Sequence, residues 1–241
     1  MAMDSLYIAY SKDAQPSDAD EVRAANQRFV PAARKSFGPS SAAGFGARLV
    51  ERNMNAAEHL LCSSALWRWF TERQLLPWVL SSQVLGDHLL EIGAGSGAAT
   101  AFLRQRVVRV TSLEYEHRSL VKLDSQRAGG SGRAVQGDAS RLPFAEQTFS
   151  SALAVLVLHH LMSPERQDQM FAEVFRVLRS GGIFFLFEIT DGWLNRAIHF
   201  RSTFTPVSPS SAPARLAAAG FSQMAIELRK GGFRLSAVRP K

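Results

Sequence analysis

The chain has little cysteine, no long apolar run and no block of like charges, and each absence excludes a class of protein. Cys62 is the single cysteine, so an internal disulfide or a metal cluster of several thiolates cannot form. The apolar runs 152–158 and 183–187 are far shorter than the roughly 20 residues that span a bilayer. We therefore expect no membrane span, no metal, no secretory signal, and a cytoplasmic location.

The size and charge of the chain are those of one ordinary domain. Its 241 residues are 46% hydrophobic and 20% charged, which leaves room for one sizeable core. The net charge of +7 is dispersed along the chain instead of forming runs. A solvated basic surface is the favoured interpretation, so a nucleic-acid partner is not expected, although acidic small molecules or RNA stay open as partners.

The first 54 residues form an extension that differs from the rest in pattern. They are rich in proline and small residues and show no sustained periodicity, so we expect at most short helices. Phe29 and Phe37 either fold over a pocket as a lid or belong to a loosely packed arm. A main domain over 55–241 then begins with a helix, because Asn55 and Glu58 form a capping-box pattern. One apolar helix face is predicted, made of Leu60, Leu61, Ser64, Trp67 and Phe70.

A glycine-rich turn follows the apolar segment 88–92 and organises the remaining sequence. Gly93, Gly95 and Gly97 alternate with small residues, and an Ala-rich segment over 98–105 predicts a helix after them. Glycine allows positive φ and lets a ligand approach the backbone. The pattern indicates a strand, a tight turn and a helix that together bind a small ligand, or a turn of the same shape that binds nothing.

The segments that follow alternate strands with helices. The strand 107–114 ends in Glu114, about 20 residues beyond the glycines, where an acid accepts hydrogen bonds from both ribose hydroxyls. Nearly continuous apolar sequence over 149–158 and 183–187 predicts two central strands with helices on both faces. The segments 223–228 and 233–238 alternate around a Lys-Gly-Gly turn, which predicts a hairpin. The fold class is therefore α/β, with a doubly wound sheet.

The Glu91-x-Gly93-x-Gly95-x-Gly97 spacing resembles motif I of the class I S-adenosylmethionine (SAM) methyltransferases, in particular the small-molecule (type 11, UbiE-like) branch. The Gly137-Asp138-Ala139 segment is similar to the third motif of the same family, and 148–161 and 177–182 also resemble it. The resemblance runs from about Asn55 to the C-terminus. It implies a Rossmann-like, seven-stranded sheet with helices on both faces and a C-terminal antiparallel hairpin.

The resemblance also implies a site. SAM is expected at Glu91, Gly93, Ala94, Gly95, Gly97, Glu114, Tyr115, Asp138, Ala139 and Val155. Glu114 would bind the ribose, Tyr115 would lie against the adenine, and Asp138 would accept from the adenine amino group unless it only caps a turn. His159 and His160 follow the fourth strand of the domain and are candidates for a general base, or for a role in shaping the site.

Methyl transfer from SAM to a small molecule, mainly by positioning, is the predicted function, with S-adenosylhomocysteine as the product. Alternatives are a SAM-binding regulatory or assembly protein without turnover, an RNA methyltransferase, and a nicotinamide-dependent dehydrogenase, which the glycine spacing disfavours. His159-His160-Leu161-Met162 stands where base-amino methyltransferases have an Asn/Asp-Pro-Pro-aromatic motif. The 5-methylcytosine methyltransferases need a nucleophilic cysteine near the fourth strand. Cys62 is far from that strand in sequence, which argues against this class. The acceptor and the oligomeric state stay open.

Overall fold

The computed structural model describes residues 6–9, 54–81, 83–125 and 132–241. These residues belong to one compact unit, which comprises 1–10 and 52–241. Most of the predicted extension 1–54, including Phe29, Phe37 and the lid proposed for them, lies outside the described residues. The division of the chain at residue 54 therefore stays a prediction.

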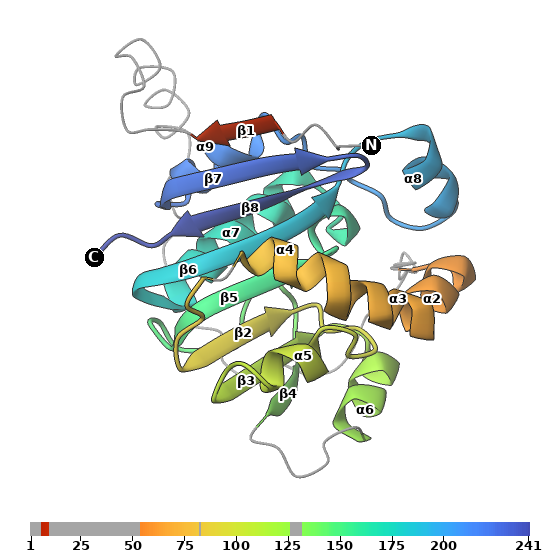
Figure 1. Ribbon diagram of the computed structural model, residues 1–241, viewed down its shortest axis with the longest axis horizontal. Coiled ribbons are helices and arrows are strands. Elements are labelled where there is room, and N and C mark those ends of the chain that lie inside the picture. Colours follow the sequence, from red (N-terminus) through yellow and green to blue (C-terminus); the bar gives the residue numbers. More distant parts are fainter. Residues whose placement is uncertain (1–5, 10–53, 82, 126–131) are drawn as a thin grey trace, which may run out of the picture. The chain divides into compact units, whose positions relative to one another are not determined.

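The architecture is a mixed sheet in the order β1-β7-β8-β6-β5-β2-β3-β4 (Figure 1). Strands β2 to β6 are parallel to one another, and β1, β7 and β8 are antiparallel to their neighbours. The strands are β1 (Leu6–Ala9), β2 (His88–Ile92), β3 (Arg109–Glu114), β4 (Arg133–Gln136), β5 (Phe149–Val155), β6 (Leu178–Ile189), β7 (Ser222–Arg229) and β8 (Gly232–Val238).

The order of the strands confirms the predicted doubly wound sheet of seven strands, β2 to β8, with its C-terminal hairpin. The described part of the extension adds β1 as an eighth strand beside β7, where helices had been expected. From β2 the chain moves outward through β3 and β4, then returns to β5 on the other side of β2. The sheet therefore has a switch point between β2 and β5, and ligands of open α/β sheets bind at the carboxyl ends of the strands there.

Helices cover both faces of the sheet because neighbouring residues of each central strand point to opposite sides. In β2, Leu89 packs in one buried cluster with residues of α4 and α5, while Leu90 packs in the other with residues of α7 and α9. In Figure 1, α4 and α5 lie in front of the sheet, and α7 and α9 lie behind it. The helices are α2 (Ala56–Ser63), α3 (Ala65–Phe70), α4 (Leu76–Leu80), α5 (Thr100–Arg104), α6 (His117–Ser125), α7 (Pro164–Val177), α8 (Trp193–Ile198) and α9 (Ala212–Ala218).

Two further helical segments are a π-helical turn over Thr71–Leu75 and a 3-10 turn over Leu158–His160. Among the residues that the structure describes, no helix has both the length and the apolar composition needed to cross a membrane.

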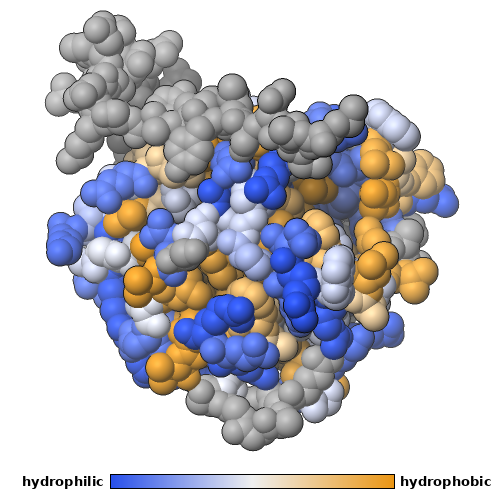
Figure 2. All heavy atoms as spheres, in the orientation of Figure 1, coloured by the Kyte–Doolittle hydropathy of each residue, from blue (hydrophilic) through white to orange (hydrophobic). Residues whose placement is uncertain are grey.

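The predicted apolar face after Asn55 is wrong, although the capping box itself is present. Leu60 and Leu61 are 74% and 46% exposed. The helix breaks at Ser64, whose side chain accepts from the Trp67 N–H and caps α3. Figure 2 shows hydrophobic residues gathered along the right-hand side of this view, over α2, α3 and α8. The break changes the direction of the chain, so residues at helical spacing do not share one face.

One helix boundary also differs from the prediction. The helix after the glycines begins at Thr100, because Ala98 and Ala99 still belong to the turn. The helix α7 ends at Val177, since Leu178 is buried and pairs with Phe149 of β5. With only five residues, α5 supplies a weaker helix dipole to the turn than the longer predicted helix.

Candidate functional site

Three of the predicted cofactor residues, Glu91, Glu114 and Asp138, lie on or just after three adjacent strands at the same end of the sheet. Glu91 of β2 pairs with Ser112 of β3, and Glu114 pairs with Gln136 of β4. Asp138 follows two residues after Gln136. Because parallel strands end at one edge, the three acids reach the carboxyl edge of the sheet together. This edge lies at the switch point beside β5.

The turn over 93–97 has the backbone that its glycines predict. Gly93, Gly95 and Gly97 have φ values of 69°, 53° and 84°. A Cβ on Gly93 would lie 2.5 Å from Val157 Cγ2, so this glycine allows close packing against the end of β5. A Cβ on Gly95 would meet nothing within 4 Å. Gly95 thus leaves open space next to bare backbone, which is the space that a bound group would use.

Glu114 lies directly against this turn. One carboxylate oxygen accepts from the Gly95 N–H at 2.7 Å, and the other accepts from the Glu116 N–H at 2.8 Å. Burial raises the pKa of Glu114, and the two backbone N–H groups partly oppose that rise. An acid about 20 residues beyond the glycines is therefore held beside them in space. This geometry fits a ribose whose hydroxyls need a carboxylate acceptor.

Glu91 is buried beneath the turn and connects the elements on either side of it through hydrogen bonds. One of its oxygens, Oε2, accepts from the Thr100 hydroxyl at 2.7 Å and from the Ser112 hydroxyl at 2.6 Å. The other oxygen is buried and has no hydrogen-bond partner within the described part of the chain. Burial raises the pKa of Glu91 to about 7, against the opposing effect of the two hydroxyls. The contacts link β2, β3 and α5, and a direct contact of Glu91 with SAM stays a prediction.

Asp138 caps the turn after β4. Its Oδ1 accepts from the Ser140 N–H at 2.8 Å and from the Ser140 hydroxyl at 2.7 Å. Its Oδ2 lies 3.0 Å from Arg166 Nη1 in an ion pair at the surface. Asp138 therefore caps this turn, as one of the two predicted alternatives has it. Adenine binding by Asp138 stays a prediction.

The remaining predicted cofactor residues surround the same edge with different exposures. Tyr115 is half-exposed, as a residue that lies against a bound ring would be. Ala94 is buried, Ala139 packs against the core cluster of α7, and Val155 packs against the cluster of α4 and α5. Their contacts with SAM stay predictions.

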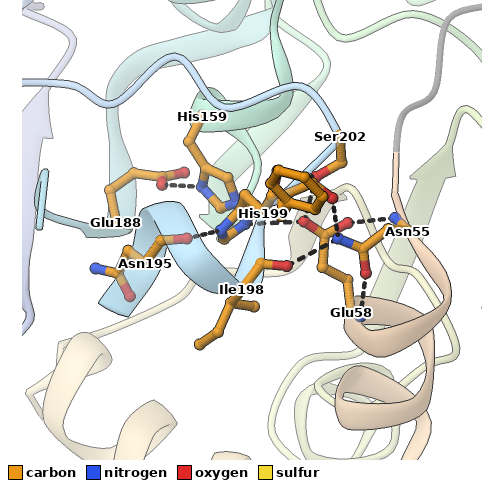
Figure 3. A network of polar contacts seen from close by, with 9 residues as sticks. Asn55, Glu58, His159, Glu188, Asn195, Ile198, His199 and Ser202 are labelled. Carbon is orange, nitrogen blue, oxygen red and sulfur yellow. Dashed lines mark hydrogen bonds and ion pairs between the residues drawn. The ribbon is translucent and has the colours of Figure 1, made fainter. Parts of the chain in front are cut away.

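A second polar group lies at the carboxyl ends of β5 and β6 (Figure 3). The ring of His159 is buried, and its Nδ1 lies 2.6 Å from Glu188 Oε2. The other oxygen of Glu188 accepts from the backbone N–H groups of Val157 and Leu158. Glu188 comes from β6, so it joins the end of β6 to the turn after β5.

His199, just after α8, extends this group toward α2. Its Nδ1 lies 2.7 Å from the Asn195 carbonyl oxygen, and its Nε2 lies 3.4 Å from Glu58 Oε1. Burial lowers the pKa of His199. Glu58 also accepts from the Ser202 hydroxyl and from the Asn55 N–H, both at 2.5 Å. As Figure 3 shows, α2 and the segment after α8 are connected through this carboxylate.

The rings of His159, His160 and His199 lie together. The centroid of the His159 ring is 4.1 Å from that of His160 and 4.9 Å from that of His199. The prediction singled out His159 and His160 but missed His199, Glu58 and Glu188. Glu188 gave one signal, since an acid inside an apolar strand is uncommon and needs a partner when buried. The other two have no local pattern that points to the site.

A bare-backbone turn with an acid beside it, at the switch point of a doubly wound sheet, is the arrangement in which open α/β folds bind nucleotide-type cofactors. A methyltransferase domain family matches residues 90–186, which contain the turn and every predicted site residue. A demethylmenaquinone methyltransferase of Thermobifida fusca is 33% identical over 101 residues, which are 40% of this chain and 41% of that protein. Residues 90–186 are therefore similar to the SAM-dependent methyltransferases, and the chain spans about two fifths of the length of this relative.

Solved structures agree with this fold. The PH0226 protein of Pyrococcus horikoshii has a TM-score of 0.62 at 20% identity and covers 74% of this chain and 93% of that one. The [4+2]-cyclase SpnF has a TM-score of 0.57 at 17% identity and covers 70% of this chain and 81% of that one. Since a neighbour with this fold is named for a cyclisation, the fold alone does not fix the reaction.

Proposed function

We propose that the chain binds SAM at the glycine turn and transfers its methyl group to a small-molecule acceptor, with S-adenosylhomocysteine as the product. The observation that carries the proposal is the contact of the Glu114 carboxylate with the Gly95 N–H, at 2.7 Å. This contact places a carboxylate that can accept from ribose hydroxyls next to the open backbone of Gly95, at the switch point of the sheet.

The residues of the site bind and orient. The Gly95 backbone approaches the cofactor, Glu114 accepts from the ribose hydroxyls, and Tyr115 and Asp138 bound the adenine. When bound, SAM supplies an electrophilic methyl group on a sulfonium, so the acceptor mainly has to be held in line with the S–C bond. Positioning of this kind contributes about 7–11 kcal/mol to the lowering of a barrier. A general base at His159 or His160 is compatible with the proposal but is not required by it.

A small acceptor and a reducing compartment both have support. The demethylmenaquinone methyltransferase relative is named for a small molecule, although the alignment spans only 41% of that protein. A covalent mechanism through cysteine is disfavoured, because burial raises the pKa of the Cys62 thiol to about 11 and so suppresses the nucleophilic thiolate. One free cysteine suits the cytoplasm.

Ligand-dependent melting tests the cofactor. SAM and S-adenosylhomocysteine should raise the melting temperature of the full chain, and NADH should leave it unchanged. A shift with NADH alone would contradict the proposal in favour of a dehydrogenase. Turnover is tested separately: cell extract is incubated with the protein and isotope-labelled SAM, and masses shifted by one labelled methyl group are sought. Tight SAM binding without any labelled product would favour a binding protein without turnover.

A further inference from the structure

We propose that His159, His160 and His199 form a binding site for one divalent first-row transition-metal ion, such as Zn²⁺, at the carboxyl ends of β5 and β6. Each histidine offers one ring nitrogen, and the three nitrogens lie within 4.8 Å of one another. Two nitrogens bound to one tetrahedral Zn²⁺ are about 3.4 Å apart. Ring rotations that bring the three nitrogens about 1 Å closer together would therefore close the site around an ion.

The hydrogen bonds of the His159 and His199 rings occupy Nδ1 and leave Nε2 available to bind a metal ion. His199 Nδ1 donates to the Asn195 carbonyl, which has no proton to give in return. His159 Nδ1 faces the carboxylate of Glu188, which likewise accepts. In the neutral rings both protons are then on Nδ1, so both Nε2 atoms carry a lone pair. Carboxylate–histidine and carbonyl–histidine pairs of this kind orient metal-bound imidazoles in proteins.

The charges around the cluster also call for a cation. Glu58 and Glu188 are both buried, with side-chain exposures of 3% and 0%. Among the described residues, their ion-pair partners are His199 and His159 and not lysine or arginine. Two buried carboxylates without a fixed positive charge are costly. One divalent ion held by three neutral histidines balances two carboxylates.

Glu58 adds a specific observation. Its Oε1 lies 3.4 Å from His199 Nε2, so a lone pair of the neutral ring faces a carboxylate oxygen. Two acceptors in this arrangement repel each other unless a cation lies near both. The Glu58 oxygen is held in place by the Ser202 hydroxyl and by the start of α2. An ion bound by the three histidines would accept the Nε2 lone pair of His199 and would lie close to the Glu58 carboxylate.

The position of the ion suggests that it binds the methyl acceptor. This step rests on the proposed methyl transfer. Val157 joins the two sites, because its N–H donates to Glu188 and its side chain packs against Gly93 of the cofactor turn. An ion with three histidine ligands keeps a position open for a further group. An acceptor hydroxyl or thiol bound there would lose its proton more readily, next to the methyl donor. His159 and His160 would then act as ligands and not as bases.

Cobalt provides the test, since Co²⁺ absorbs visible light when nitrogen ligands bind it. Untagged full-length protein, freed of metal with a chelator, is titrated with CoCl₂ in the absence of SAM. We expect one Co²⁺ per chain, and displacement by one equivalent of ZnCl₂. His199→Ala should weaken binding at least about 100-fold. Glu188→Gln should weaken it about 10–100-fold through loss of the carboxylate that orients His159.

The control variant is His117→Gln, which removes an exposed histidine of α6 far in sequence from the cluster and should bind like wild type. Circular dichroism and melting check the fold of each variant, and His160→Ala replaces His199→Ala if that protein does not fold. Absence of stoichiometric Co²⁺ binding, or equal binding by wild type and the cluster variants, would overturn the proposal. Co²⁺ binding by a chain that fails to bind SAM would keep the metal site and reject the proposed function.

Discussion

The two ends of the site differ in how the chain builds them. The proposed cofactor end comes from three short segments at the carboxyl ends of β2, β3 and β4, and each carries its own sequence pattern. The histidine end gathers Glu58, His159, Glu188 and His199 from α2, the turn after β5, β6 and the segment after α8. The first end is built mainly from backbone, whereas the second depends on long-range contacts between side chains.

This difference explains what the sequence could predict. The glycine spacing and the strand-end acids are local patterns, so the turn, Glu114 and the doubly wound sheet followed from them. His199 and Glu58 are 141 residues apart in the chain, and no spacing rule connects them. The predicted helix face at Leu60 and Leu61 failed for a similar reason: the hydroxyl of Ser64 ends one helix and starts another. Periodicity cannot detect such a break.

The two ends also differ in how far they are shared with the matched family. The backbone-built end is what the chain shares with a family that matches residues 90–186. The histidine end includes three residues outside that range, Glu58, Glu188 and His199. We therefore expect the acceptor and its chemistry to depend on α2 and on the segment after α8, and the cofactor to depend on the turn.

The largest effect is expected at the backbone of the cofactor end. Gly95→Val places a β-branched side chain at φ 53° and fills the open space next to the turn. SAM affinity should fall at least about 100-fold, measured by calorimetry. The far-UV circular dichroism should stay near wild type, because no atom lies within 4 Å of the added Cβ. Unchanged affinity would mean that the ligand does not approach this backbone.

A second effect, on stability, is expected beneath the turn. The pKa of Glu91 is raised from 4.5 to about 7 in the folded chain, so between these values the folded state binds a proton that the unfolded state has released. Stability should therefore fall as pH rises from about 4.5 to 7, and level off above it. The contribution is about 3 kcal/mol.

Glu91→Gln cannot titrate and keeps an acceptor for Thr100 and Ser112. Urea unfolding of both proteins at a series of pH values measures the difference. The gap between wild type and variant should change by about 3 kcal/mol over this range, in favour of the variant at higher pH. A gap that does not depend on pH would show that Glu91 titrates normally in the folded chain.

The smallest effect is expected at the surface pair of Asp138 and Arg166. Arg166→Ala should change the free energy of unfolding by less than about 1 kcal/mol, because the pair is partly exposed. It also frees Asp138 Oδ2, so SAM affinity should be kept or slightly raised. Asp138→Ala should lower SAM affinity if this carboxylate binds the adenine. Equal SAM affinity of wild type and Asp138→Ala would leave Asp138 as a turn cap only.

We propose that the Glu114 carboxylate at the glycine turn binds the cofactor. Calorimetric titration of S-adenosylhomocysteine into wild type, Glu114→Ala and the control Asp124→Ala in α6 tests this role of Glu114. Wild type and the control should bind alike. Glu114→Ala should lose about 1–3 kcal/mol of binding free energy, with the loss of charge-assisted hydrogen bonds. Equal binding by all three proteins would contradict the claim and move the cofactor away from this turn.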